Sequence, residues 1–283
     1  MAGPVVVGVD GSESSMYAVR LAAREAAYRQ LRLHIVHAFV WPLVRVPLGP
    51  VPGGPESAGL TRAAEKIVEE ARQQAATVAP ECPISSDIIE GVPISVMLEQ
   101  AADADLAVVG SRGLGAVTGL LVGSVAIALV THTGCPVLIA RGNDSAPAEA
   151  PVVAGVDGSD ATAGVLEFAF AEAHFRDVPL AAVHAWTHST EDPVDRDRAE
   201  AAGDRVLAES LAGWQDRYPD VPVLPQTPRN RAVPALIEAS AHAQLVVVGA
   251  RGHRRRPGPR IGSVGAALVR HAESPVAVIR PAQ

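Results

Sequence analysis

The sequence contains a long internal repeat, which restricts its possible architectures more than any other property. The run PVVVGVDGS at 4–12 returns as PVVAGVDGS at 151–159, so Asp157 follows Asp10 by 147 positions. The run LAVVGSRG at 106–113 returns as LVVVGARG at 245–252, which is 139 positions later. A repeat this long and detailed indicates that a whole domain has been duplicated.

The repeat divides the 283 residues into a first domain at 1–141, a linker at 142–150 and a second domain at 151–283. The linker, GNDSAPAEA, is assigned by its small and polar composition. The first copy is longer than the second, and we expect its extra residues in the Pro- and Gly-rich stretch 42–59, as a surface excursion. Each copy is large enough to bury a core of its own.

Short apolar runs alternate with helical patterns in both copies. Hydrophobic residues make up 48% of the chain but aromatic residues only 4%, so the core must consist of Ala, Val, Leu and Ile, which suits a parallel sheet. We therefore predict an α/β fold of two tandem Rossmann-like, doubly wound domains, each a five-stranded parallel sheet flanked by helices. The first copy predicts strands at 5–10, 33–38, 84–89, 106–110 and 137–141, and helices at 16–30, 61–79, 93–101 and 124–131.

Charge and cysteine content exclude several classes of protein. The net charge of −7 argues against general binding to nucleic acid or to an anionic membrane, both of which favour a positive surface. The amino-terminal segment does not resemble a signal peptide, and no apolar stretch reaches the roughly 18 residues of a membrane helix. Two cysteines form neither a disulfide framework nor a zinc motif, so a reduced, cytoplasmic location is expected.

The unusual repeated residues follow two of the predicted strands. Asp10 and Gly110 come at the ends of the first and fourth strands of one copy, and Asp157 and Gly249 occupy the same positions in the other. In open doubly wound sheets, ligands bind beyond the carboxyl ends of the strands, where the strand order reverses. We therefore expect a ligand site between these two strand ends in each copy.

A glycine pattern, G-x2-G-x9-G-S, occurs twice at identical spacing, from Gly110 and from Gly249. Glycine permits a positive φ and a close approach of the backbone to a ligand. Gly-Ser at the start of a helix offers free N–H groups, a hydroxyl and the positive end of the helix dipole, which together form a phosphate site. The aspartates could accept hydrogen bonds from ribose hydroxyls or hold a metal ion. Arg112 and Arg251 could contact phosphate or pair with a carboxylate.

These landmarks resemble the universal stress protein family in its tandem form, and the resemblance covers essentially the whole chain. The landmarks are the opening VGVDGS, the loop G-x2-G-x9-G-S and the closing CPV strand. The resemblance implies ATP, up to two per chain and with Mg²⁺ possible, a role in stress response, and dimerisation through the last strand. We expect a homodimer and an unidentified protein partner. The candidate nucleotide-binding residues are Val9, Asp10, Ala38, Gly110, Arg112, Gly113, Gly123, Ser124 and Val125 in the first copy, and Asp157, Ala185, Gly249, Arg251, Gly252, Gly262, Ser263 and Val264 in the second.

The chain also departs from the family pattern. A further serine often follows the Gly-Ser pair by two positions, and Ala126 and Gly265 stand there instead. The second loop carries four arginines and a histidine within 253–260, which could grip phosphate or form a solvated basic turn. ATP binding by the first copy is therefore the firmer expectation.

The sequence predicts neither catalytic nor metal-binding residues. Lys66 is the single lysine and lies in a helical context, so the chain cannot form a Walker P-loop. His37 and His184 recur at the ends of the second strands, and we expect structural roles for them. A nucleotide-binding regulatory protein is the leading hypothesis. The alternatives are a slow ATPase or nucleotide hydrolase, and a scaffold that does not bind nucleotide.

Overall fold

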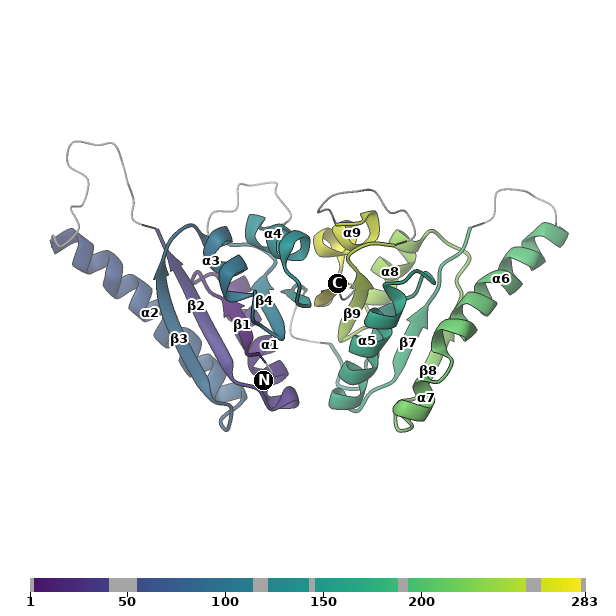
Figure 1. The fold of residues 1–283 in the computed structure, drawn as a ribbon, viewed down its shortest axis with the longest axis horizontal. Coiled ribbons are helices and arrows are strands. Elements are labelled where there is room, and N and C mark those ends of the chain that lie inside the picture. Colours follow the sequence, from purple (N-terminus) through teal and green to yellow (C-terminus); the bar gives the residue numbers. More distant parts are fainter. Residues whose placement is uncertain are drawn as a thin grey trace. The chain divides into compact units, whose positions relative to one another are not determined.

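The computed structural model describes residues 3–40, 55–113, 122–142, 146–187, 193–252 and 261–280. The chain divides into two compact units, 1–140 and 141–283, and each contains a β-sheet flanked by helices (Figure 1). Four features singled out in the sequence lie wholly or partly outside the described residues: the basic loop 253–260, most of the first glycine loop at 114–121, residues 42–54 of the Pro- and Gly-rich stretch, and residues 143–145 of the linker.

The first unit has a parallel sheet of order β3-β2-β1-β4-β5. Its strands are β1 (Val5–Gly8), β2 (Leu33–Phe39), β3 (Ile84–Glu90), β4 (Leu106–Gly110) and β5 (Val137–Ala140). Its helices are α1 (Glu13–Arg29), α2 (Pro55–Val78), α3 (Pro93–Gln100) and α4 (Ser124–His132). Helix α1 packs beside α2, and α3 beside α4.

The second unit repeats this arrangement with the order β8-β7-β6-β9-β10, again parallel throughout. Its strands are β6 (Val152–Gly155), β7 (Leu180–Val183), β8 (Val223–Gln226), β9 (Leu245–Gly249) and β10 (Val276–Ile279). Its helices are α5 (Thr162–Arg176), α6 (Pro193–Leu211), α7 (Trp214–Arg217), α8 (Ala232–Ser240) and α9 (Ser263–His271). The predicted doubly wound α/β fold is confirmed for both copies.

The strand order places a switch point in each unit. From β1 the chain leads through α1 to β2 and β3 on one side, and then crosses back to β4 and β5 on the other. The carboxyl ends of β1 and β4 are therefore adjacent, with the connections leaving in opposite directions, which is where doubly wound sheets bind ligands. In the second unit β6 and β9 are the corresponding pair.

Helix α1 begins at a favoured N-cap residue and ends at a residue with a left-handed backbone. Ser12 is its N-cap: the Ser12 hydroxyl accepts a hydrogen bond from Ser15 N at 3.1 Å, which satisfies one of the unpaired amides of the first turn. At the other end Gln30 adopts the left-handed conformation, with φ 54°. Asp177 closes α5 in the same way, with φ 53°.

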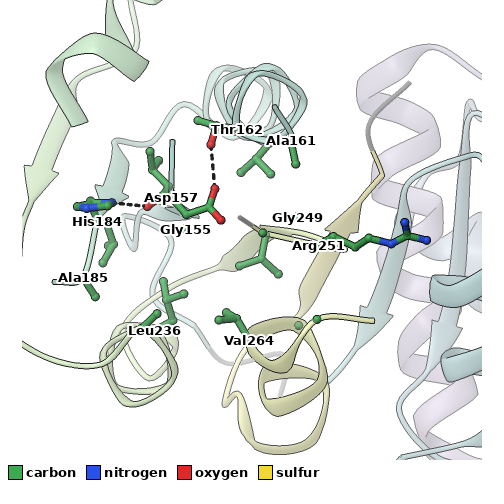
Figure 2. A pocket seen from close by; sticks show the side chains of 18 of the residues that line it. Gly155, Asp157, Ala161, Thr162, His184, Ala185, Leu236, Gly249, Arg251 and Val264 are labelled. Carbon is green, nitrogen blue, oxygen red and sulfur yellow. Dashed lines mark hydrogen bonds between the residues drawn. The ribbon is translucent and has the colours of Figure 1, made fainter. Parts of the chain in front are cut away.

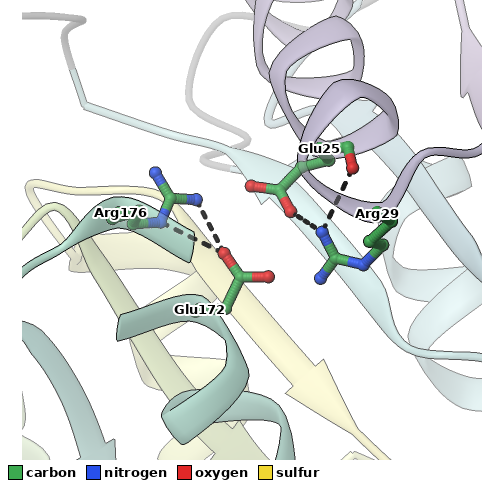
Figure 3. Close-up of polar contacts among 4 residues, drawn as sticks. All are labelled: Glu25, Arg29, Glu172 and Arg176. Atoms are coloured by element: carbon green, nitrogen blue, oxygen red, sulfur yellow. Dashed lines mark hydrogen bonds and ion pairs between the residues drawn. The ribbon is translucent and has the colours of Figure 1, made fainter. Parts of the chain in front are cut away.

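A buried ion pair recurs in the two units. Glu25 is fully buried on α1 and pairs with Arg29 one turn later (Figure 3). On α5, Glu172 is equally buried, and its Oε2 accepts from Arg176 Nη2 at 2.8 Å and from Arg176 Nε at 3.1 Å. A carboxylate deprived of water requires such a partner, because its desolvation is otherwise uncompensated.

Most helix ends lie within three residues of the prediction, and the largest differences are at α2 and at its counterpart in the second unit. Helix α2 begins at Pro55 rather than at residue 61, so part of the expected loop is the first turns of a helix. In the second unit Gly213, with φ 79°, interrupts the corresponding helix and starts the short α7. This break places Trp214 and Tyr218 against the buried Phe170 of α5, at ring-centroid distances of 5.4 and 5.5 Å.

Candidate functional site

A pocket of about 270 Å³ lies at the switch point of the second unit (Figure 2). This volume is close to the lower end of the roughly 300–1,000 Å³ typical of small-molecule sites. The wall combines the ends of β6, β7 and β9 with residues from the starts of α5, α8 and α9. All eight candidate residues of the second copy line it: Asp157, Ala185, Gly249, Arg251, Gly252, Gly262, Ser263 and Val264.

Asp157 supplies a carboxylate to this pocket. Its Oδ1 accepts hydrogen bonds from Ser159 N at 3.0 Å and from Thr162 Oγ1 at 3.2 Å, and Figure 2 shows the bond from Thr162. These two donors, one from the turn and one from the first residue of α5, fix the orientation of the carboxylate. The other oxygen, Oδ2, lies against Gly252 of the glycine loop.

The glycines of the loop are required for close packing rather than for a left-handed backbone. From the sequence alone, a positive φ is one reason to expect glycine in this motif. None of its six described glycines has a positive φ: Gly110, Gly113, Gly123, Gly249, Gly252 and Gly262. A Cβ atom added at Gly252 would instead collide with Asp157 Oδ2. The loop and the carboxylate therefore approach as closely as the backbone allows.

The second end of the glycine motif forms the start of α9. Gly262 is the N-cap, and its N–H donates to Ala250 O at 2.8 Å, which ties the helix start to the end of β9. Ser263 is the first helical residue. The amides of this turn and the helix dipole create a site that attracts an anion.

Arg251 lines the pocket, but its side chain extends away from Asp157 and Leu236 (Figure 2). Burial, and secondarily the charge of Arg251, lower the pKa of Arg280 at the end of β10. The two guanidinium groups are therefore close enough for their like charges to interact.

The opposite end of the pocket is apolar. Its surface includes Val183, Leu236 and Val248, with Ala185 at the edge. His184 also lines this end, and its Nδ1 lies 2.8 Å from Val156 O. Because a carbonyl only accepts, Nδ1 carries the proton and the ring fastens the end of β7 to the end of β6.

The backbone of Ala185 faces the pocket. Val183 O accepts from Val156 N on the β6 side, whereas His184 N and Trp186 N donate to Gln226 O and Pro228 O on the β8 side. Peptide groups alternate in direction along a strand, so the N–H and C=O of Ala185 point toward β6, which has already ended at Gly155. The Trp186 ring is held by a hydrogen bond from Nε1 to Thr227 O at 2.9 Å.

The first unit brings together the corresponding residues. Asp10 Oδ1 accepts from Ser12 N at 3.0 Å and from Ser12 Oγ at 2.6 Å, and a Cβ added at Gly113 would lie 2.5 Å from Asp10 Oδ2. Gly123 N donates to Ser111 O at 2.8 Å, which repeats the tie at the start of α9.

The remaining candidates of the first unit occupy expected positions around the strand ends. Val9 N donates to Val36 O at 2.9 Å, and His37 Nδ1 lies 2.8 Å from Val9 O, which repeats the contact of His184. Ala38 lies in β2, Gly110 ends β4, and Arg112 is exposed in the loop. Ser124 and Val125 form the first turn of α4.

Several pocket residues were missed in the sequence. Thr162 could have been found, because a hydroxyl at the start of a helix five residues after Asp157 is placed to bond that carboxylate. Leu236 and Val248 carry no signal, since they read as ordinary core residues. Gly265, where the family often has serine, also lines the pocket.

The structure gives two further findings on its described parts. No described helix is both long and apolar enough to cross a membrane. Within the same residues, no cluster of three or more His, Cys, Asp or Glu side chains is arranged to hold a metal ion.

The two doubly wound sheets, with a pocket at the switch point of the second, define an α/β protein of the Rossmann-like class. The universal stress protein family profile matches residues 1–141 and 150–280, and the chain belongs to that family. It is 38% identical over 288 residues to the universal stress protein Rv2623 of Mycobacterium tuberculosis, covering 98% of this chain and 96% of that protein.

The fold agrees with that of a solved structure over almost the whole chain. A universal stress protein from Archaeoglobus fulgidus superposes with a TM-score of 0.73 at 17% identity, covering 98% of each chain. A further universal stress protein, solved in complex with cAMP, is 30% identical; it covers 49% of this chain and 97% of its own, with a TM-score of 0.38. An adenine nucleotide is thus a ligand of that relative.

Proposed function

We propose that this protein binds ATP at the switch point of each unit and acts as a regulatory protein whose nucleotide-bound state is recognised by a partner. The observation that carries the proposal is the pocket of the second unit. It joins an oriented carboxylate, a glycine loop and a helix N-terminus at one end to an apolar surface at the other. A nucleotide has the same sequence of groups: phosphates, ribose and base.

The apolar end fits the base. Val183, Leu236 and Val248 offer flat apolar contact, and the N–H and C=O of Ala185 offer one donor and one acceptor side by side. Adenine presents an acceptor and an amino donor on its Watson–Crick edge, which matches that pair. Guanine presents its carbonyl where adenine has the amino group, so two acceptors would face each other.

The polar end fits ribose and phosphates. Asp157 accepts hydrogen bonds only, so it suits ribose hydroxyls and repels phosphate unless a cation lies between them. Mg²⁺ in phosphate sites is commonly held by one or two carboxylates together with the phosphates, so Asp157 and a triphosphate would suffice for it. The amides around Gly252, Gly262 and Ser263 would hold the phosphates.

Binding rather than turnover is proposed because Asp157 is the single carboxylate among the described residues that line the pocket. His184 lines the apolar end of the pocket rather than the glycine loop, and Arg251 extends away from Asp157. In this proposal the bound nucleotide favours one conformation of the protein, and the partner binds that conformation. The nucleotide must then have a higher affinity for that conformation than for the other. The partner we propose is an unidentified protein, and a homodimer is the proposed assembly.

Isothermal titration of the full chain with ATP, AMP and GTP in the presence of Mg²⁺ tests this function. We expect up to two ATP per chain, and GTP weaker by about tenfold or more, which is the effect of about 1.4 kcal/mol from mispaired polar groups. Multiple turnover of ATP well above buffer background would favour the hydrolase alternative. Failure of every adenine nucleotide to bind would favour the scaffold.

A further inference from the structure

The two sites differ in the layer of side chains beneath the glycine loop. In the first unit Ser14 and Ser111 lie there, with their Oγ atoms 3.4 Å apart. The second unit has Ala161 and Ala250 at the same positions of the repeat. Two hydroxyls that contact each other are thus replaced together by two methyl groups.

Ser14 lies directly against the end of β4. A Cβ atom added at Gly110 would lie 2.7 Å from Ser14 Oγ, and Arg112 N donates to this oxygen at 3.4 Å. Its counterpart Ala161 lines the pocket of the second unit, where a Cβ added at Gly249 would lie 3.2 Å from the Ala161 methyl. Ser14 therefore occupies, at the switch point of the first unit, the position that lines the pocket in the second unit.

Hydrogen-bond capacity determines what Ser14 can offer a ligand. A serine hydroxyl has two lone pairs and one proton. The amide of Arg112 uses one lone pair, and the hydroxyl of Ser111, whose Oγ lies 3.4 Å away, can either donate to Ser14 or accept from it. In the arrangement in which Ser111 donates, both lone pairs of Ser14 are used and its proton is left for a ligand, and a donor beside a phosphate-binding loop favours an anionic oxygen.

We propose that Ser14 is a phosphate-directed donor that makes the first site more selective for nucleotide phosphates than the second. This inference rests on the proposed nucleotide function. At the second site Ala161 supplies no donor, so the phosphates there are held by backbone amides, by Ser263 and by the helix terminus. The two sites of one chain consequently differ in how strongly they distinguish a nucleotide from its nucleoside.

The test compares the affinities for ATP and adenosine at one site at a time. Gly252→Val, which forces a side chain against Asp157, disables the second site and leaves the first for titration calorimetry. In that background Ser14→Ala is expected to lower the affinity for ATP about tenfold and to leave that for adenosine unchanged, which corresponds to one charge-assisted hydrogen bond. Ser14→Thr keeps the hydroxyl and should keep the affinity for ATP.

The reciprocal change adds a gain of function. Gly113→Val disables the first site, and Ala161→Ser in that background should raise the affinity for ATP relative to adenosine. If Ser14→Ala leaves the ratio of the two affinities unchanged while ATP still binds, the inference is wrong and the proposed function stands. If the unsubstituted chain binds no ATP, both are wrong. If the unsubstituted chain binds ATP but the Gly252→Val chain does not, the first site takes no ATP; the inference is then refuted, and the proposed function holds for the second unit only.

Discussion

Adding one methyl group to the glycine loop of each unit should weaken ATP binding without unfolding the protein. Among the described residues, a Cβ at Gly113 or Gly252 meets closely only the carboxylate of Asp10 or Asp157. Because neither glycine has a positive φ, the penalty of alanine is steric rather than conformational. To make room, each carboxylate must rotate away from the donors that orient it.

The magnitude follows from those donors. Displacing Asp157 weakens the hydrogen bonds from Ser159 N and Thr162 Oγ1, each worth about 1 kcal/mol, and moves the loop away from its ligand. A tenfold loss of affinity, about 1.4 kcal/mol, is therefore expected at each site. At ATP equal to 100 times the original Kd, ligand stabilisation falls from about 2.7 to about 1.4 kcal/mol. At about 3 °C per kcal/mol, the ATP-induced rise in Tm falls from about 8 to about 4 °C.

The assay is thermal unfolding with and without MgATP on the Gly113→Ala/Gly252→Ala chain and on each single variant. Gly134→Ala is the matched control, because an added Cβ there has no atom within 4 Å and the residue is exposed. The control should keep the full rise in Tm. If the double variant keeps it as well, the loop does not bind ATP in the way proposed.

Three further predictions concern stability and thiol chemistry. Glu172→Gln removes the charge that pairs with Arg176 in a buried setting and should lower the free energy of unfolding by about 3 kcal/mol in urea titrations; a loss below about 1 kcal/mol would contradict the burial of the pair. Phe170→Ala should cost about 3–5 kcal/mol in the same assay, and Tm should fall accordingly, unless neighbouring rings close the cavity. Burial raises the pKa of both thiols, so the reactive thiolate is scarce at pH 8; the enclosed Cys135 should react with a disulfide reagent much more slowly than Cys82, and equal rates would refute this.

The buried strands could be predicted from their short, continuously apolar sequences. Runs such as Leu106–Gly110 are apolar at every position, end in glycine and recur at the same point of the repeat. Helix ends were harder to predict. Gly59 made the segment before residue 61 resemble a loop, yet α2 starts at Pro55, since proline is favoured in the first helical turn and one glycine is tolerated in a long helix.

The polar half of the site was predictable and the apolar half was not. Asp157 and Gly252 are unusual residues at unusual positions, so the repeat marks them. Val183 and Leu236 are core residues of ordinary type, and only the tertiary packing of β7 and α8 determines which side chains of this kind border the pocket. The role of the Ser14 hydroxyl could not be predicted for a similar reason. In the sequence Ser14 is one of several serines at a helix start, and only its distance to Arg112 N relates it to the glycine loop.

The placement of Trp186 gives the second site an optical reporter of its own. The indole is largely buried, is fixed by its bond to Thr227 O and follows the pocket residue Ala185 directly. The first copy has Phe39 at the same position of the repeat, and the other two tryptophans of the chain are Trp41 and Trp214. In a chain in which those two are replaced by phenylalanine, the tryptophan fluorescence would come from Trp186 alone. It would therefore follow nucleotide binding at the second site and not at the first.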